Sequence, residues 1–123
     1  MSELEKNYIC PLKHLADTFG GKWKLPIICI LSCDNDSPKR YSVLKRRLGN
    51  ITNLMLAQSL RELESFGLVH REQYNEIPPR VEYSLTERGK SALTFLTHAA
   101  EWAMKDLQED SQQIFCDKCV ITD

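Results

Sequence analysis

Apolar side chains recur three and four residues apart along much of this chain, the spacing that places them on one face of a helix. In the first such segment Pro11 suits the opening helical position, and Gly20 follows the last apolar residue, Phe19. Thr52 and Thr86 are favourable N-cap residues ahead of two longer apolar stripes. The pattern predicts helices over residues 11–19, 23–32, 41–48, 53–66 and 87–107.

The pattern changes from helical to alternating after Gly67, and alternation over a few residues indicates a half-buried strand. Residues 68–74 and 81–85 are the two strand candidates, and two adjacent prolines stiffen the hairpin tip between them. Residues 33–38 are polar and predict a loop between the second and third helices.

The predicted order is three helices, a glycine turn, a fourth helix, a strand, a proline-tipped hairpin, a second strand and a final helix. Two short helices joined by a turn and followed by a hairpin form a winged helix-turn-helix. We therefore expect a mostly helical α+β fold, a winged helix-turn-helix with added N- and C-terminal dimerisation helices. The expected parts are an N-terminal arm (1–10), a DNA-binding and dimerisation domain (11–108) and a flexible C-terminal tail (109–123).

The distribution of charge is more informative than its sum. The whole chain of 123 residues has a formal net charge of −1. Between Lys22 and Arg80 there are ten Lys and Arg against six Asp and Glu, whereas the two flanks together hold six against eleven. DNA binding needs a local positive face rather than a basic whole, so the basic centre is compatible with a nucleic-acid partner.

The helix that follows Thr52 is the second helix of the predicted pair, the one that enters the major groove in such domains. Its buried stripe is expected to be Met55, Leu56, Leu60, Leu63 and Phe66. Asparagine and glutamine side chains can pair with adenine, and arginine can pair with guanine or hold phosphate. The residues expected at the DNA on this helix are Thr52, Asn53, Leu54, Ala57, Gln58 and Arg61.

Cations ahead of this helix and at the base of the wing are expected to contact phosphates. Each has a structural alternative, because a surface charge is often only solvated or paired locally. For Arg61 the alternative is a pair with Glu64, and for the wing arginine it is a local salt bridge. The expected phosphate contacts are Lys39, Arg40, Lys45, Arg46 and Arg80.

The last helix carries more apolar surface than a small domain needs for its own core. Together with the first helix it predicts a two-fold interface, which would also give operator binding its symmetry. The alternative is burial of the same residues within one chain. The expected interface residues are Leu12, Leu15, Phe19, Leu96, Ala99, Trp102 and Ala103.

Several stretches resemble the HxlR-type subfamily of bacterial winged helix regulators, related to the MarR group. The resemblance covers roughly Cys10 to Trp102, and its most specific part is the wing, Ile77-Pro78-Pro79-Arg80-Val81-Glu82-Tyr83-Ser84-Leu85-Thr86. Other matching stretches are Cys10-Pro11, Gly20-Gly21-Lys22-Trp23-Lys24, Arg40-Tyr41, Ile51-Thr52, Leu60-Arg61-Glu62-Leu63-Glu64 and Gly67-Leu68-Val69.

The resemblance implies an intracellular homodimer whose terminal helices interlock and which binds a palindromic operator in double-stranded DNA. The chain departs from the family pattern at two positions. Pro26 lies where a straight helix former is expected, and Leu54 takes an early recognition-helix position that is usually polar. The contact at Leu54 would then be apolar, for example to a thymine methyl.

Cys10 would sit at the N-cap of the first helix, where the helix dipole favours a thiolate. Similar regulators sense electrophiles or oxidants through a cysteine at this position, so a small electrophile or oxidant is a candidate effector. An unreactive thiol is the alternative. Cys116 and Cys119 form a lone C-x-x-C, which gives weak support to a redox or metal role; no metal site is expected.

No glycine-rich phosphate loop, nucleophile elbow or acid–base pair is visible, so we expect neither an enzyme nor a cofactor. With no secretion signal and no long apolar span, we expect a cytoplasmic protein without a membrane partner. A winged helix used only for protein–protein contact is the competing function. A thiol oxidoreductase using Cys116 and Cys119 would need a thioredoxin-like sheet, which the pattern lacks.

Overall fold

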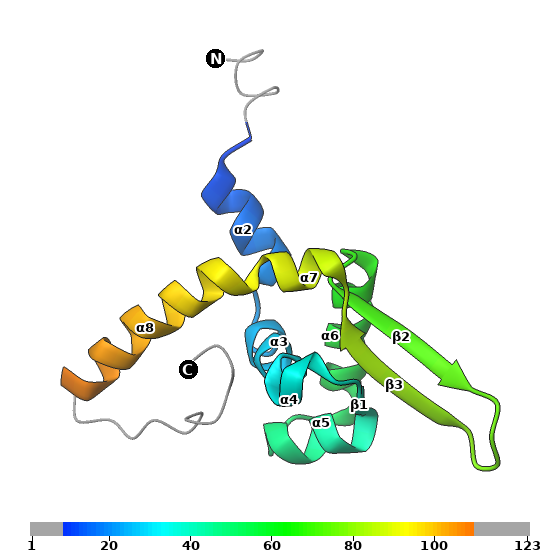
Figure 1. Cartoon of the computed structure of the whole chain (residues 1–123). Coiled ribbons are helices and arrows are strands. Elements are labelled where there is room, and N and C mark those ends of the chain that lie inside the picture. Colours follow the sequence, from blue (N-terminus) through cyan, green and yellow to red (C-terminus); the bar gives the residue numbers. More distant parts are fainter. Residues whose placement is uncertain (1–8, 110–123) are drawn as a thin grey trace.

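A computed structural model describes residues 9–109, and its helices and strands follow the predicted order (Figure 1). The elements are α2 (Pro11–Phe19), α3 (Lys24–Leu31), α4 (Cys33–Asp36), β1 (Lys39–Arg40), α5 (Tyr41–Leu48), α6 (Asn53–Ser65), β2 (Val69–Tyr74), β3 (Arg80–Leu85), α7 (Glu87–Ser91) and α8 (Leu93–Glu109). The winged helix-turn-helix prediction is confirmed: α5 and α6 form the helix pair and β2–β3 the wing.

The sheet within the described residues has three antiparallel strands in the order β1–β3–β2. Val69 pairs with Leu85 at the base of the wing, and Tyr74 pairs with Arg80 near its tip. Lys39 pairs with Tyr83, which adds the short strand β1 to the opposite edge of β3. The sequence pattern did not predict β1, because two residues are too few for a periodic signal.

The core lies where α3, α5 and α6 meet the base of the sheet. Its fully buried side chains come from all of these elements, for example Ile28 from α3, Leu44 from α5, Leu60 from α6 and Val69 from β2. The hairpin and α8 project away from this body in different directions, and α2 packs on the side of α7 and α8 (Figure 1). The wing and the terminal helices are thus held apart by one compact centre.

Two local predictions were wrong. The polar loop over 33–38 contains a left-handed turn, α4, in which Asp34, Asn35 and Asp36 all have positive φ, a region that Asn and Asp adopt more readily than most residues. The single helix over 87–107 is instead two helices that meet at Ala92. There the Ala92 N–H donates to the carbonyl of Gly89, and the Ser91 hydroxyl takes the Arg88 carbonyl.

No helix in the described part of the chain is both long and apolar enough to span a lipid bilayer.

Candidate nucleic-acid interface

The start of α6 is fixed as the sequence predicted. Thr52 has extended backbone angles, and its Oγ1 accepts a hydrogen bond from the Met55 N–H at 3.1 Å. This bond satisfies one of the amide groups that no helical carbonyl can reach. The helix ends at Gly67, whose φ of 76° is a conformation that glycine adopts without steric cost.

One face of α6 packs on the core and the opposite face is open. Leu56, Leu60 and Leu63 are buried, as predicted. Met55 and Phe66 were expected in the same stripe, but both are exposed, because they lie at its edges. The residues predicted to meet DNA lie on the open face: Asn53, Leu54, Gln58 and Arg61 are exposed, and Ala57 is half-buried.

Contacts from α5 set the position of the first turn of α6. The Tyr41 hydroxyl contacts the Asn53 carbonyl at 3.1 Å and the Asn53 side-chain oxygen at 3.3 Å. Burial raises the pKa of Tyr41, so the neutral donor form is favoured. The Lys45 ammonium donates to the Ile51 carbonyl at 2.9 Å, across the turn. Lys45 therefore braces the helix pair, which reduces its availability for phosphate.

An ion pair that sequence reasoning missed fastens the back of α6 to α3. The Lys24 ammonium lies 3.1 Å from a Glu62 carboxylate oxygen and 4.9 Å from the centre of the Phe66 ring. The Lys24 side chain is 10% exposed. Because a buried lysine is expensive without a partner, Glu62 is required at that helical position, and this pair helps fix the rotation of α6.

The cations predicted to hold phosphate differ sharply in placement. Lys39 is 5% exposed, and its ammonium donates to the carbonyls of Cys33 at 2.8 Å and Ser37 at 2.6 Å. Burial lowers its pKa. The expectation that Lys39 contacts phosphate does not fit this placement. Arg40 and Arg46 are exposed, and no hydrogen bond or ion pair to another described residue engages either guanidinium.

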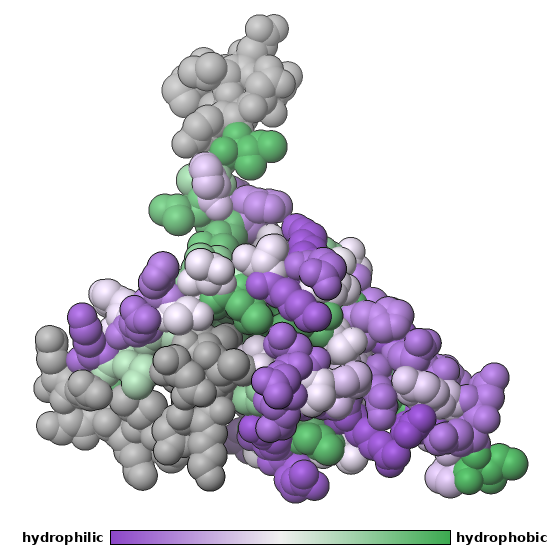
Figure 2. Space-filling model, viewed as in Figure 1, coloured by the Kyte–Doolittle hydropathy of each residue, from purple (hydrophilic) through white to green (hydrophobic). Residues whose placement is uncertain are grey.

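Arg80 is tied into the wing rather than extended from it. Its guanidinium lies 4.1 Å from the centre of the Tyr74 ring, 3.4 Å from a Glu76 oxygen and 3.9 Å from a Glu82 oxygen. This is the local salt bridge that the sequence left open as the alternative. The outermost apolar residue is Ile77, fully exposed at the hairpin tip, where Figure 2 shows an apolar end on an otherwise hydrophilic wing.

A cationic cleft that the sequence did not reveal lies between α6 and the wing. Arg61 of α6 and Arg71 of β2 both line a cavity of about 420 Å³, with Glu64 beside them. Arg71 is exposed and has only a long contact, 3.5 Å, to the Gln73 oxygen. Hydrophilic side chains gather over α5 and the hairpin in Figure 2. The strand pattern alone gave no reason to single out Arg71, because its partner Arg61 is ten positions away on another element.

The predicted interface residues fall into two groups. Phe19 and Leu96 are buried within the chain itself, and the Phe19 ring meets the Phe95 ring edge-on at 5.9 Å, which fastens α2 to α8. Leu12 is 74% and Trp102 71% exposed, unusually high for large apolar side chains. Ala99 is exposed, and Leu15 and Ala103 are half-buried.

An apolar groove of about 310 Å³ runs between α3 and α8, lined by Leu25 and Pro26 on one side and by Ala99 and Ala103 on the other. The groove and Trp102 place much of the apolar surface of α8 outside the core.

Cys10 is half-buried and lies directly before Pro11 at the start of α2, as predicted. The His14 N–H donates to the Cys10 carbonyl at 2.9 Å, which begins the helical hydrogen bonding. Cys116 and Cys119 lie outside the described residues.

The chain matches known regulators along most of its length. The family described as HxlR-like helix-turn-helix matches residues 18–111. An uncharacterized HTH-type transcriptional regulator from Methanothermobacter thermautotrophicus is 46% identical over 98 residues, 80% of this chain and 72% of that protein.

Two solved structures share the fold as well as sequence. The HTH-type transcriptional regulator ytcD superposes with a TM-score of 0.75 at 39% identity, covering 81% of this chain and 99% of that one. The redox regulator HypR in its oxidized form gives 0.71 at 38% identity, covering 86% and 100%. With the family match, these likenesses show that the chain belongs to the HxlR-like helix-turn-helix family of transcriptional regulators.

Proposed function

We propose that this regulator binds a palindromic operator in double-stranded DNA as a homodimer, with α6 of each subunit in a major groove. The observation that carries the proposal is the open face of α6, where Asn53, Gln58 and Arg61 stand exposed beside one another. These are the side chains that can form paired hydrogen bonds with adenine and guanine edges. Leu54 is exposed on the same helix and offers an apolar contact to a thymine methyl.

Three arginines around α6 supply the backbone contacts that position the helix. Arg40 and Arg46 flank the start of the helix pair, and Arg71 lies across the cleft from Arg61 on the wing. Lys39, Lys45 and Arg80 have structural roles instead, and we leave them out of the proposed contact surface. A dimer would thus present about six such arginines, which predicts a salt slope of about −5 in a plot of log affinity against log salt.

Dimerisation through α2 and α8 is supported by the exposed apolar residues of these helices. Leu12, Ala99 and Trp102 have no covering in one chain, and the α3–α8 groove continues the same apolar surface. Two-fold pairing of these faces would remove that surface from water and set two copies of α6 side by side.

The test is a titration of a labelled duplex from the upstream region of the gene, and of a random duplex pool, at several salt concentrations. Arg46→Gln should make the salt slope less negative by about 2, because each dimer loses two phosphate contacts. Lys90→Gln is the matched control: Lys90 is exposed on α7, at the opposite end of α6 from α5. Affinity that ignores salt, or no binding to any duplex, would favour the protein–protein module instead.

A redox or electrophile response through Cys10 is a second proposal. Its support is the place of Cys10 at the start of a helix and the likeness to HypR, which is described as a redox regulator. A quinone would add to the sulfur, and a peroxide would convert it to sulfenic acid. Operator binding of the parent chain should change after treatment, and that of Cys10→Ser should not. An equal response of the two proteins would remove Cys10 from the mechanism.

A further inference from the structure

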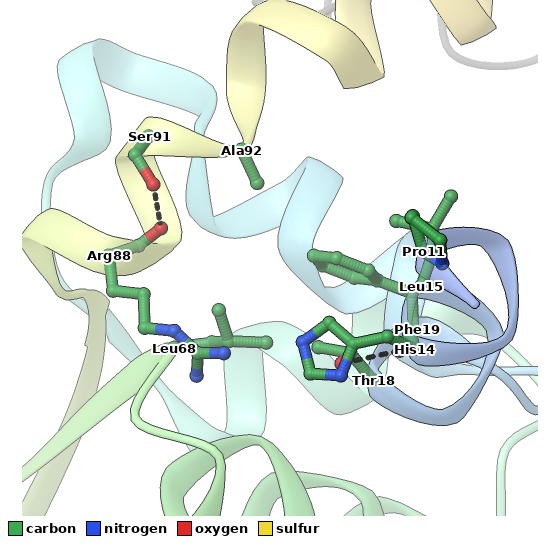
Figure 3. A pocket seen from close by; sticks show the side chains of 9 residues that line it. All are labelled: Pro11, His14, Leu15, Thr18, Phe19, Leu68, Arg88, Ser91 and Ala92. Carbon is green, nitrogen blue, oxygen red and sulfur yellow. Dashed lines mark hydrogen bonds between the residues drawn. The ribbon is translucent and has the colours of Figure 1, made fainter. Parts of the chain in front are cut away.

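A second apolar cavity, of about 200 Å³, lies away from the α6 face, between α2 and the base of the wing. Leu15 and Phe19 of α2 form one wall, and Leu68 and Ala92 form the other. Figure 3 shows the side chains of His14 and Arg88 at the same edge of this cavity, one on either side of Leu68. The cavity thus combines apolar walls with two nitrogen-bearing groups at one edge.

The Arg88 guanidinium is uncommitted within the described part of the chain. The residue is exposed, no hydrogen bond or ion pair to a described residue engages its side chain, and only its backbone carbonyl is taken, by the Ser91 hydroxyl at 2.6 Å. The imidazole of His14 likewise has no hydrogen-bond partner among the described residues, although its backbone carbonyl accepts from Thr18.

Carboxylates on the same two helices do not neutralise this edge, because lysines hold them. Asp17 of α2 lies 3.1 Å from the Lys13 ammonium, and Glu87 of α7 lies 3.8 Å from the Lys90 ammonium. A positive charge without a local partner beside an apolar cavity fits a ligand that is anionic at one end and apolar at the other.

We propose that this cavity binds a small organic acid, with its carboxylate at Arg88 and His14 and its compact apolar body between α2 and Ala92. A guanidinium can hold a carboxylate through two parallel hydrogen bonds, and a neutral imidazole can donate one more. The small volume excludes large ligands and favours a single ring or a short chain.

The position of the cavity gives the ligand a route to the DNA-binding surface, a consequence that rests on the proposed function. Leu68 precedes β2, Arg88 follows β3, and Ala92 is the junction between α7 and α8. A bound acid would therefore contact the N-terminal helix, the base of the wing and the start of α8 together. A ligand with different affinity for two wing positions would shift operator affinity.

Calorimetric titration of the full-length protein, without DNA, tests the site itself. The probes are benzoate and hexanoate, with benzamide and hexanamide as neutral counterparts of similar shape. At least one acid should bind saturably with a dissociation constant near or below about 1 mM, as expected for ligands of this size, and its amide should bind at least tenfold more weakly, since the charged hydrogen bonds are lost.

Arg88→Gln should weaken binding of the acid by about tenfold or more, because it removes the charged donor. Ala92→Phe should abolish binding by filling the cavity, and Lys90→Gln should leave binding unchanged; thermal unfolding checks that each variant is folded. No saturable binding of either acid, or equal binding by the parent and Arg88→Gln, would overturn the proposal. Because DNA is absent, failure here is distinct from failure of operator binding.

Discussion

Lys39 and Arg40 are neighbours with the same charge but opposite roles, so substituting each in turn separates folding from DNA binding. Lys39 is buried and Arg40 is exposed. We predict that Lys39→Met destabilises the fold and leaves the salt dependence of DNA binding unchanged. We predict the reverse for Arg40→Gln.

The magnitude for Lys39 follows from its two short hydrogen bonds. The ammonium joins the carbonyls of Cys33 and Ser37, which flank the left-handed turn of α4, at 2.8 and 2.6 Å. A hydrogen bond to a charged group contributes about 1.5–3 kcal/mol, and relief of lysine desolvation offsets part of the loss. A net destabilisation of about 2 kcal/mol is expected, which for a chain of this size lowers Tm by roughly 8 °C.

The magnitude for Arg40 comes from the DNA side. Its guanidinium is exposed, so the free energy of unfolding should change by less than about 0.5 kcal/mol. Each dimer loses two phosphate contacts, so the salt slope should become less negative by about 2. The salt slope is measured by fluorescence anisotropy on a labelled duplex and Tm by calorimetry, with both variants beside the parent. A stable Lys39→Met variant with a reduced salt slope would refute the assignment of these two side chains.

Three further predictions concern the helix cap, the interface and pH. Thr52→Ala should lower the free energy of unfolding by about 1 kcal/mol, measured by urea titration, because the Met55 N–H loses its acceptor. Ala99→Glu should convert a dimer to a monomer by light scattering, since it places a charge on the apolar face of α8; an unchanged dimer mass would rule out that face. Burial lowers the pKa of Lys39, so the folded chain binds fewer protons than the unfolded chain at alkaline pH. The stability of the parent relative to Lys39→Met should therefore rise between about pH 8 and about pH 10, and a fall would contradict the sign.

Features set by local sequence were predictable. The cap at Thr52, the end of α6 at Gly67 and the change from helical to alternating spacing each depend on a few adjacent residues. The same periodicity placed Gln58 and Arg61 on the exposed face of α6, because burial of one face of an amphipathic helix determines the other.

Features that depend on distant partners were not predictable from periodicity. The burial of Lys39 requires carbonyls that point inward from a left-handed turn, and that turn was predicted only as a loop. The meeting of Arg61 with Arg71 depends on how the hairpin folds back toward α6. Arg80 was assigned to DNA on charge alone, whereas the aromatic ring of Tyr74 and two carboxylates hold it in the wing.

Methylation protection by dimethyl sulfate, on a duplex selected from a random pool, tests the central claim most directly. The reagent reports guanine N7 in the major groove and adenine N3 in the minor groove. Two α6 helices in successive major grooves predict two protected guanine patches, centred about 10 base pairs or a multiple apart, and loss of both in Arg61→Ala. A single patch, or protection confined to adenine N3, would contradict a dimer that reads DNA with α6.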